Sequence, residues 1–167
     1  MKRMTILLAL LASLPFVTGA MSKQVQQVTG LIDGQPISER KAQDQLPQSH
    51  APIWTEFTKC KVSLNDNTGM FSINVTPEVK ALSGQTITVS GFVMPLDGSD
   101  RTKHFLLTRR TPVCFFCPPG EPNEVVEVLS PKAIQWTDNL VTVSGPLSLI
   151  NNGEKGMFFR VAGATVK

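Results

Sequence analysis

The chain has 167 residues, a formal net charge of +3, 41% hydrophobic residues and three cysteines. This length suits one domain with a single hydrophobic core. Nucleic-acid affinity depends on many phosphate contacts, and so small a charge cannot supply them, so we exclude nucleic acid as a partner. The chain has no tyrosine and only two histidines. That leaves few acid–base groups near neutral pH, which favours a binding or accessory protein over an enzyme.

The amino-terminal residues have the three parts of a cleavable signal peptide. Lys2 and Arg3 form a charged start, residues 4–17 are an apolar run, and residues 18–20 are small, as signal peptidase requires. The apolar run is shorter than the roughly 20 residues that a membrane span needs. We therefore expect cleavage after Ala20, a periplasmic location and no transmembrane segment in the mature chain. Its formal charge falls to +1, since two cations and no anion are removed.

The sequence that follows the signal peptide of residues 1–20 divides into a polar arm and a folded domain. Residues 21–52 form a polar arm, rich in glutamine and without sustained apolar periodicity. This composition predicts an extended or mobile spacer, and docking of the arm on a partner is the alternative. Within the arm, residues 38–46 favour a short helix. We expect residues 53–167 to form the folded domain.

The first part of the folded domain predicts a hairpin followed by a helix. Apolar residues alternate with polar ones from Cys60 to Leu64, which predicts a half-buried strand over 57–64 with Cys60 on its apolar face. A turn sequence leads to a returning strand over 70–75. A short helix is expected within 76–84, because threonine and proline begin this segment and glycine ends it.

The clearest pattern is a pair of similar strands, residues 86–93 and 140–147. Both contain Thr-Val-Ser-Gly, and a glycine within a strand marks a bulge or bend. Three further strands are expected over residues 104–108, 124–129 and 157–162. Five strands of this kind predict an all-β fold, namely a small five-stranded Greek-key barrel of OB type with a short helix and an amino-terminal extension. A β-sandwich is the alternative.

The main chemical signal is the pair Cys114 and Cys117. Two cysteines at this spacing can form a disulfide, as thiols in an oxidising compartment do, or can share a metal ion. A disulfide of Cys60 with either of them is also open. A metal ion needs more ligands than two, and Cys60 and His104 are the candidates, with His50 a weaker one. Zinc and copper(I) both accept thiolate, so the pattern does not distinguish these metals.

Four cations bracket the strand that precedes the cysteine pair: Arg101, Lys103, Arg109 and Arg110. Cations near Cys114 would favour its thiolate form and so assist metal capture or thiol exchange. A solvated basic rim around the strand is the alternative.

The sequence resembles a known family in two motifs, Gly-Phe-Val-Met-Pro-Leu at residues 91–96 and the segment 113–126 around the cysteine pair. The family is an uncharacterised one of exported bacterial proteins, a domain of unknown function. Its members share a Gly-Tyr-Val-Val-Pro-Leu strand and a cysteine-containing loop that runs into a proline-rich stretch ending in asparagine. The resemblance covers about residues 54–162. Phe92 stands where tyrosine is common.

The resemblance implies which residues of the loop are distinctive: Cys114, Cys117, Pro118, Pro119 and Asn123. Some members of the family look like accessories of envelope ABC-transporter clusters linked to zinc supply, which implies a metal-related role. In this sequence a Gly-Glu pair at 120–121 interrupts the usual proline run.

Three hypotheses about function follow. The leading one is a periplasmic accessory protein that binds zinc or copper, or a metal-carrying partner, through the loop of Cys114 and Cys117. The second is thiol–disulfide exchange by the same pair. The third is a structural module that docks on an envelope transporter. In that case the cysteines form only a disulfide that stabilises the module.

Overall fold

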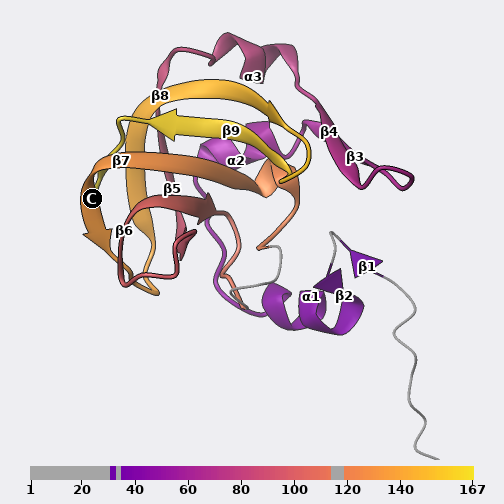
Figure 1. The fold of residues 1–167 in the computed structure, drawn as a ribbon, viewed down its shortest axis with the longest axis horizontal. Helices are drawn as coiled ribbons and strands as arrows, with labels where there is room; N and C mark the ends of the chain where they lie inside the picture. Colours follow the sequence, from indigo (N-terminus) through magenta and orange to yellow (C-terminus); the bar gives the residue numbers. More distant parts are fainter. Residues whose placement is uncertain (1–30, 33–34, 114–118) are drawn as a thin grey trace, which may run out of the picture.

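The structure is a computed structural model, and it describes residues 31–32, 35–113 and 119–167. Five strands close into a mixed barrel (Figure 1): β5 (Thr86–Pro95), β6 (Arg101–Thr108), β7 (Val125–Gln135), β8 (Val141–Asn152) and β9 (Met157–Ala162). Around the barrel β5 pairs with β6, β6 with β7, β7 in parallel with β9, β9 with β8, and β8 with β5. The expected all-β, OB-like Greek-key barrel is confirmed, and the structure is not the alternative β-sandwich.

Glycines let two of these strands turn corners of the barrel. In β5, residues 86–91 pair with β8 and residues 92–95 pair with β6, so the strand changes partner directly after Gly91. A β-carbon at Gly91 would lie 2.7 Å from the carbonyl oxygen of Thr108. The second strand, β8, pairs with β5 up to Pro146 and with β9 from Leu147, so it changes partner one residue beyond Gly145. Both predicted bends are confirmed, and Gly91 shows the reason, which is close approach of a neighbouring backbone.

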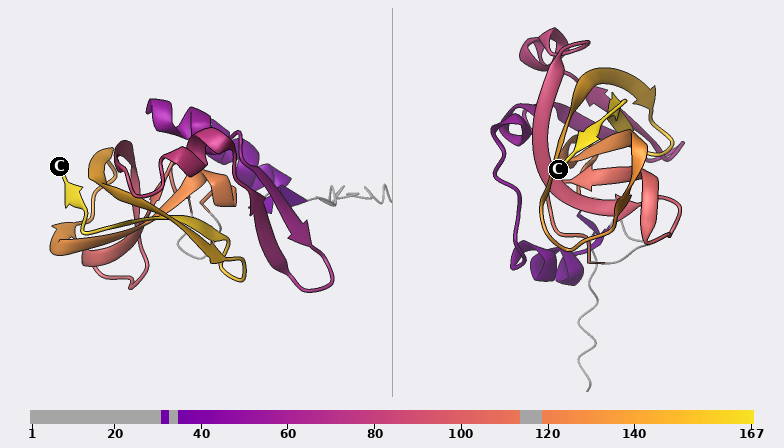
Figure 2. Two further views of the ribbon diagram at one scale, coloured as in Figure 1. Left: turned by 90° about the horizontal axis from the view of Figure 1, so that it is seen from above. Right: turned by 90° about the vertical axis from the view of Figure 1, so that its left-hand side faces the viewer.

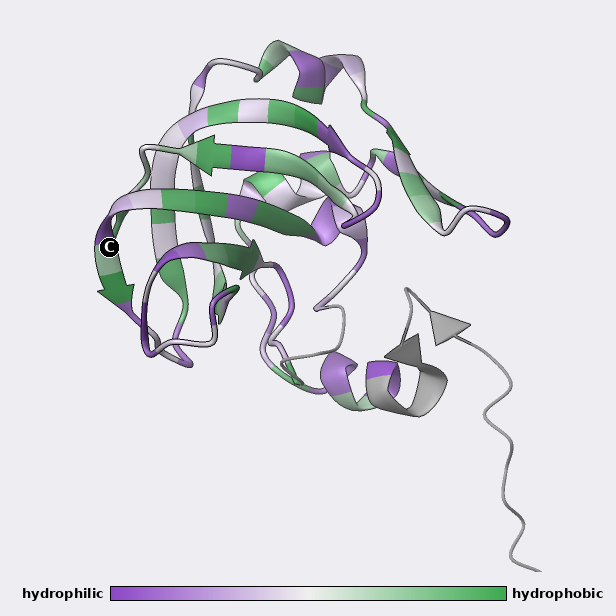
Figure 3. Cartoon of the chain, in the orientation of Figure 1, coloured by the Kyte–Doolittle hydropathy of each residue, from purple (hydrophilic) through white to green (hydrophobic). Residues whose placement is uncertain are grey.

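A short helix, α2 (Pro52–Phe57), packs on the interior of the barrel. Phe57 is fully buried and stacks on Phe159 of β9 with a 4.3 Å distance between ring centroids, and the ring of Trp54 meets Phe57 edge-on. The indole Nε1 of Trp54 donates a hydrogen bond to the carbonyl oxygen of Ser90 at 2.8 Å. These aromatic rings fill the core, whose apolar strand residues appear as green bands in Figure 3.

The strand predicted over 57–64 is wrong in its first half. Residue 57 ends α2, Cys60 lies in the turn after it, and β3 begins only at Lys61. Proline at the start of α2 favours a helix, and Trp54 and Phe57 lie three residues apart, which places both on one helical face. Cys60 is buried as expected. The alternation after it does not give β3 a buried face, because the side chain of Leu64 is exposed.

The hairpin formed by β3 (Lys61–Asn65) and β4 (Met70–Asn74) extends away from the barrel (Figure 2). It is followed by α3 (Pro77–Ala81), whose N-cap Thr76 accepts a hydrogen bond from the backbone of Val79, so the predicted helix is confirmed. A 3-10 turn, η1 (Pro122–Glu124), leads into β7, and β10 (Thr165–Val166) pairs with β8.

The amino-terminal part of the described chain contains two short strands, β1 (Leu31–Ile32) and β2 (Gln35–Pro36), and a helix, α1 (Ile37–Asp44). The helix coincides with the one that the sequence favoured within the polar arm. In the described ranges, no helix is long and apolar enough to cross a membrane.

Candidate functional site

The candidate site is the base of the cysteine loop. Cys114, Cys117 and Pro118 lie outside the described residues, so we describe the backbone at Thr111 and Pro119, which we call the loop stem. The side-chain nitrogen of Gln43 in α1 donates to the carbonyl oxygens of Thr111 and Pro119, each at 3.0 Å. Gln43 is fully buried. One amide from the amino-terminal arm therefore joins both ends of the loop.

Further contacts hold the arm against the same region. The backbone nitrogen of Ser49 donates to the carbonyl oxygen of Arg109 at 2.8 Å, and the hydroxyl of Thr111 donates to the carbonyl oxygen of Pro47 at 2.6 Å. Asp44 forms an ion pair with Arg110. Residues 43–49 thus lie along the end of β6 and the start of the cysteine loop.

A buried carboxylate binds two of the predicted cations. Glu124 accepts hydrogen bonds from Arg109 at 2.6 Å and from Arg110 at 2.9 Å. Burial lowers the pKa of Arg110, but Glu124 and Asp44 outweigh this effect and the pKa lies above its ordinary value. These two arginines are therefore bound in ion pairs and do not form the solvated basic rim that was one interpretation of the sequence. Arg101 and Lys103 are exposed.

Asn123 connects η1 to the turn that holds Cys60. Its side-chain nitrogen donates to the carbonyl oxygen of Cys60 at 2.8 Å. Asn123 is 4% exposed and its Oδ1 atom has no hydrogen-bond partner among the described residues. Cys60 is a fully buried free thiol, so the disulfide with Cys114 or Cys117 that the sequence left open for it is not formed. Its Sγ atom lies 4.0 Å from the carbonyl oxygen of Glu56. The distinctive asparagine of the loop motif thus anchors the turn in which Cys60 lies.

His104 lies on the outer face of β6 and is 46% exposed. Its Nε2 atom donates to Glu127 at 2.8 Å, and Arg160 donates to the other oxygen of Glu127 at 2.7 Å. Burial raises the pKa of Glu127, but the hydrogen bonds from Arg160 and His104 outweigh it, so this pKa lies below its ordinary value. The bond to Glu127 fixes the ring of His104 and directs Nδ1 away from that carboxylate.

The structure does not bring the two supplementary ligand candidates together. Cys60 belongs to the core inside the barrel, whereas His104 is on the outside of β6. Among the described residues, no three histidine, cysteine, aspartate or glutamate side chains are grouped to hold a metal ion. The placement of Cys114 and Cys117 relative to either candidate lies outside the described residues.

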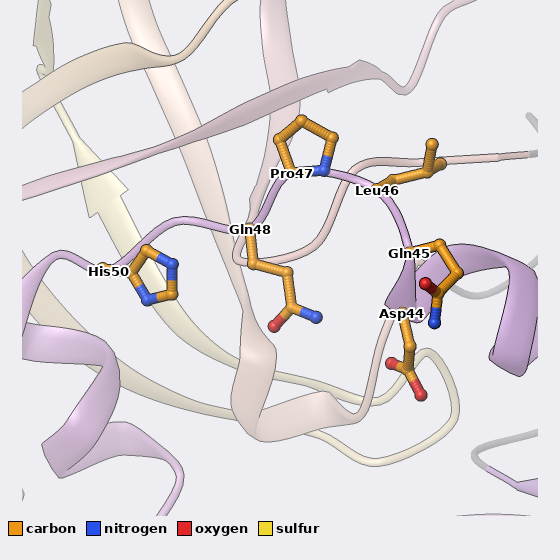
Figure 4. Close-up of a pocket in the computed structure, with 6 residues that line it drawn as sticks. All are labelled: Asp44, Gln45, Leu46, Pro47, Gln48 and His50. Carbon is orange, nitrogen blue, oxygen red and sulfur yellow. The ribbon is translucent and has the colours of Figure 1, made fainter.

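His50 lies in the segment that joins α1 to α2, shown with its neighbours in Figure 4. It lines a small cavity of about 150 Å³ together with Trp54 and Arg109, and an open hollow with Asp44 and Gln48. His50 therefore lies beside Arg109, which directly follows β6, the strand that precedes the cysteine loop.

Sequence reasoning missed the residues that hold the site together: Gln43, Glu124 and Glu127. Gln43 is one of several glutamines in the arm, and nothing in the sequence distinguishes it from exposed Gln45. Glu127 did carry a signal, since it is a lone charge between Val126 and Val128 in an apolar run. Such a residue needs a partner on the outer face of the strand.

The fold defines the chain as a small OB-type barrel protein with a docked amino-terminal helix. Residues 20–160 match the family described as "Protein of unknown function (DUF3299)", and the chain belongs to this family. The crystal structure of a DUF3299 family protein from Pseudomonas aeruginosa is similar at 22% identity, covering 74% of this chain and 82% of that one, with a TM-score of 0.48. A search of curated proteins found no match.

Proposed function

We propose that the chain is an exported accessory protein that binds a transition metal, zinc or copper(I), through the thiolates of Cys114 and Cys117. The observation that carries the proposal is the loop stem: Gln43 donates to both Thr111 and Pro119 at 3.0 Å and is fully buried. A loop whose two ends are joined loses less conformational entropy when it binds an ion.

The donor set suits a thiophilic ion. Thiolate sulfur selects zinc and copper(I) over the hard cations, which prefer oxygen ligands. A second reason lies in the described surroundings of the loop stem. The carboxylate of Glu124 is bound to Arg109 and Arg110 and so does not offer its oxygens to a hard cation. Further ligands come from Cys60, His104, solvent or a partner protein, and a bound metal supplies no chemistry here beyond being carried or delivered.

Export and a transporter partner belong to the same proposal. Residues 1–20 have the pattern of a signal peptide, and a periplasmic chain with a metal-binding loop suits delivery to an envelope ABC transporter. Export is tested by fractionating cells that express the chain with and without residues 2–20. The intact chain should be shortened and periplasmic, and the truncated one should remain in the cytoplasm. Full-length protein in the cytoplasm in both cases would contradict export.

The test of metal binding uses protein purified from the compartment in which it accumulates. Free thiols are counted and bound zinc and copper are measured, before and after mild reduction. We expect close to one metal ion per reduced chain, and its loss in the double variant Cys114→Ser/Cys117→Ser. The variants Cys60→Ala and His104→Gln show whether either residue is a further ligand.

Each result distinguishes the rival functions. A permanently oxidised, metal-free chain would overturn the proposal and leave a docking module with a stapling disulfide. A metal-free chain whose cysteines cycle readily between dithiol and disulfide would overturn it in favour of thiol–disulfide exchange.

A further inference from the structure

A small cavity beside α2 takes no part in the proposed metal site. It measures about 150 Å³ and lies between the segment before α2, the helix itself and Arg109. A water molecule takes up about 30 Å³ of the liquid, so the cavity has room for a group of a few non-hydrogen atoms. We infer that it binds a small oxyanion, a phosphate or a carboxylate. This inference does not depend on metal binding by the cysteines.

Three side chains with hydrogen-bond donors line the cavity: His50 from the segment before α2, Thr55 from α2, and Arg109 directly after β6. A guanidinium carries five N–H groups. That of Arg109 makes one hydrogen bond among the described residues, from Nη1 to Glu124. The side chains of His50 and Thr55 have no hydrogen-bond partner in the part of the chain that the structure describes. These donors are therefore available to a ligand.

The charges around the cavity favour an anion over a cation. Among the described residues that line it, none is an aspartate or a glutamate. Two carboxylates lie close by, but Glu124 is bound to Arg109 and Arg110, and Asp44 is bound to Arg110. A cation would therefore meet the guanidinium of Arg109 without a carboxylate to balance it. Negatively charged oxygens, in contrast, accept short hydrogen bonds from a guanidinium.

Buried hydrogen bonds hold the walls of the cavity in place. The hydroxyl of Ser49, a residue only 1% exposed, donates to the carbonyl oxygen of Ser90 at 2.5 Å and accepts from the indole Nε1 of Trp54 at 3.2 Å. The backbone nitrogen of Ser49 donates to the carbonyl oxygen of Arg109 at 2.8 Å. The segment that carries His50 is thus joined to β5, to α2 and to Arg109. A cavity held in this way needs little rearrangement when an anion enters it.

The test is a titration of the purified protein with inorganic phosphate and, separately, with acetate, each compared with sodium chloride at the same ionic strength. Two-dimensional NMR gives one indole N–H signal for each of the two tryptophans. Trp54 lines the cavity, whereas Trp136 is 43% exposed in the segment after β7. The variant Trp136→Phe assigns the two signals. We expect a saturable shift of the Trp54 signal with at least one of the two anions, and an unchanged Trp136 signal.

Variants of the donors test which side chains hold the anion. Arg109→Lys keeps a positive charge beside Glu124 but loses the planar fork of the guanidinium, and His50→Ala removes the imidazole. Each should raise the Kd on the order of tenfold, because a hydrogen bond to a charged group is lost. The matched control is Arg101→Lys, which makes the same change at an exposed position away from the cavity. The isosteric Thr55→Val provides a further test if Arg109→Lys does not fold.

The outcomes are distinct. No saturable shift with either anion would overturn the inference, and so would an unchanged Kd in both His50→Ala and Thr55→Val. Parallel shifts of the two indole signals that sodium chloride reproduces would show a general salt effect and would overturn it as well. None of these variants changes a cysteine or His104, so the result does not depend on whether the chain binds a metal ion.

Discussion

Two buried carboxylates, Glu124 and Glu127, each bind two basic side chains near the surface of the barrel. Glu124 binds Arg109 and Arg110 beside the loop stem, and Glu127 binds Arg160 and His104 on the outer face. Removing one member of such a group leaves an unpaired buried charge, which costs more than the intact pair contributes. The two groups therefore constrain the positions of β6, β7 and β9.

We predict that Glu127→Gln lowers the free energy of unfolding by about 1–3 kcal/mol at pH 7, because Arg160 loses its charged partner. The pKa of Glu127 is lower in the folded chain than its ordinary value of 4.5. Its contribution is therefore complete above that value and is lost as the pH falls through the folded pKa. The difference between parent and variant should shrink below about pH 4.5 in urea unfolding measured from pH 3 to 7.

The control for this prediction is Glu154→Gln, which removes an exposed carboxylate and should leave stability nearly unchanged. A difference between the parent and Glu127→Gln that stays constant over the whole pH range would show that Glu127 does not act through its charge.

A second residue-scale prediction concerns Gly91. A β-carbon there would lie 2.7 Å from the carbonyl oxygen of Thr108 and 2.8 Å from the Cγ atom of Leu107. Because both atoms belong to the packed barrel, Gly91→Ala should destabilise the fold by about 1–3 kcal/mol. Thermal unfolding followed by circular dichroism measures this, and an unchanged midpoint would show that the corner of β5 can move.

At the scale of elements, the sequence predicted the barrel strands well and the region before them less well. The five strands and the bends at Gly91 and Gly145 follow from local patterns: alternation, and glycine within a strand. The alternation from Cys60 to Leu64 favoured a strand that begins at Phe57, and helix α2 was not predicted. Burial of Trp54 and Phe57 on one helical face decides the structure of this segment. That burial depends on tertiary contacts, which alternation alone does not reveal.

The contribution of α2 can be measured directly. Phe57 is fully buried and stacks on Phe159, so Phe57→Ala should lower the free energy of unfolding by about 3–5 kcal/mol, the usual cost of a large cavity in a core. Lys59→Ala, which removes an exposed ion pair with Glu56, should leave the free energy of unfolding nearly unchanged. Equal effects in urea unfolding would mean that α2 does not belong to the core.

At the scale of the whole molecule, the polar arm and the cysteine loop meet although they are more than 60 residues apart in the sequence. The cysteine pair was visible in the sequence because its spacing is local. The contact of Gln43 with Thr111 and Pro119 was not, since one glutamine among several carries no mark of its distant partners. The sequence therefore indicates the chemistry of the candidate site but not the residues that support it.

The central claim is that the two loop sulfurs are ligands of a metal ion. X-ray absorption at the metal edge of the reduced, metal-loaded chain tests this most directly, because it measures which atoms surround the ion. For zinc, we expect at least two sulfur neighbours at about 2.3 Å, and no bound zinc in Cys114→Ser/Cys117→Ser. A shell of nitrogen and oxygen alone at about 2.0–2.2 Å would contradict it.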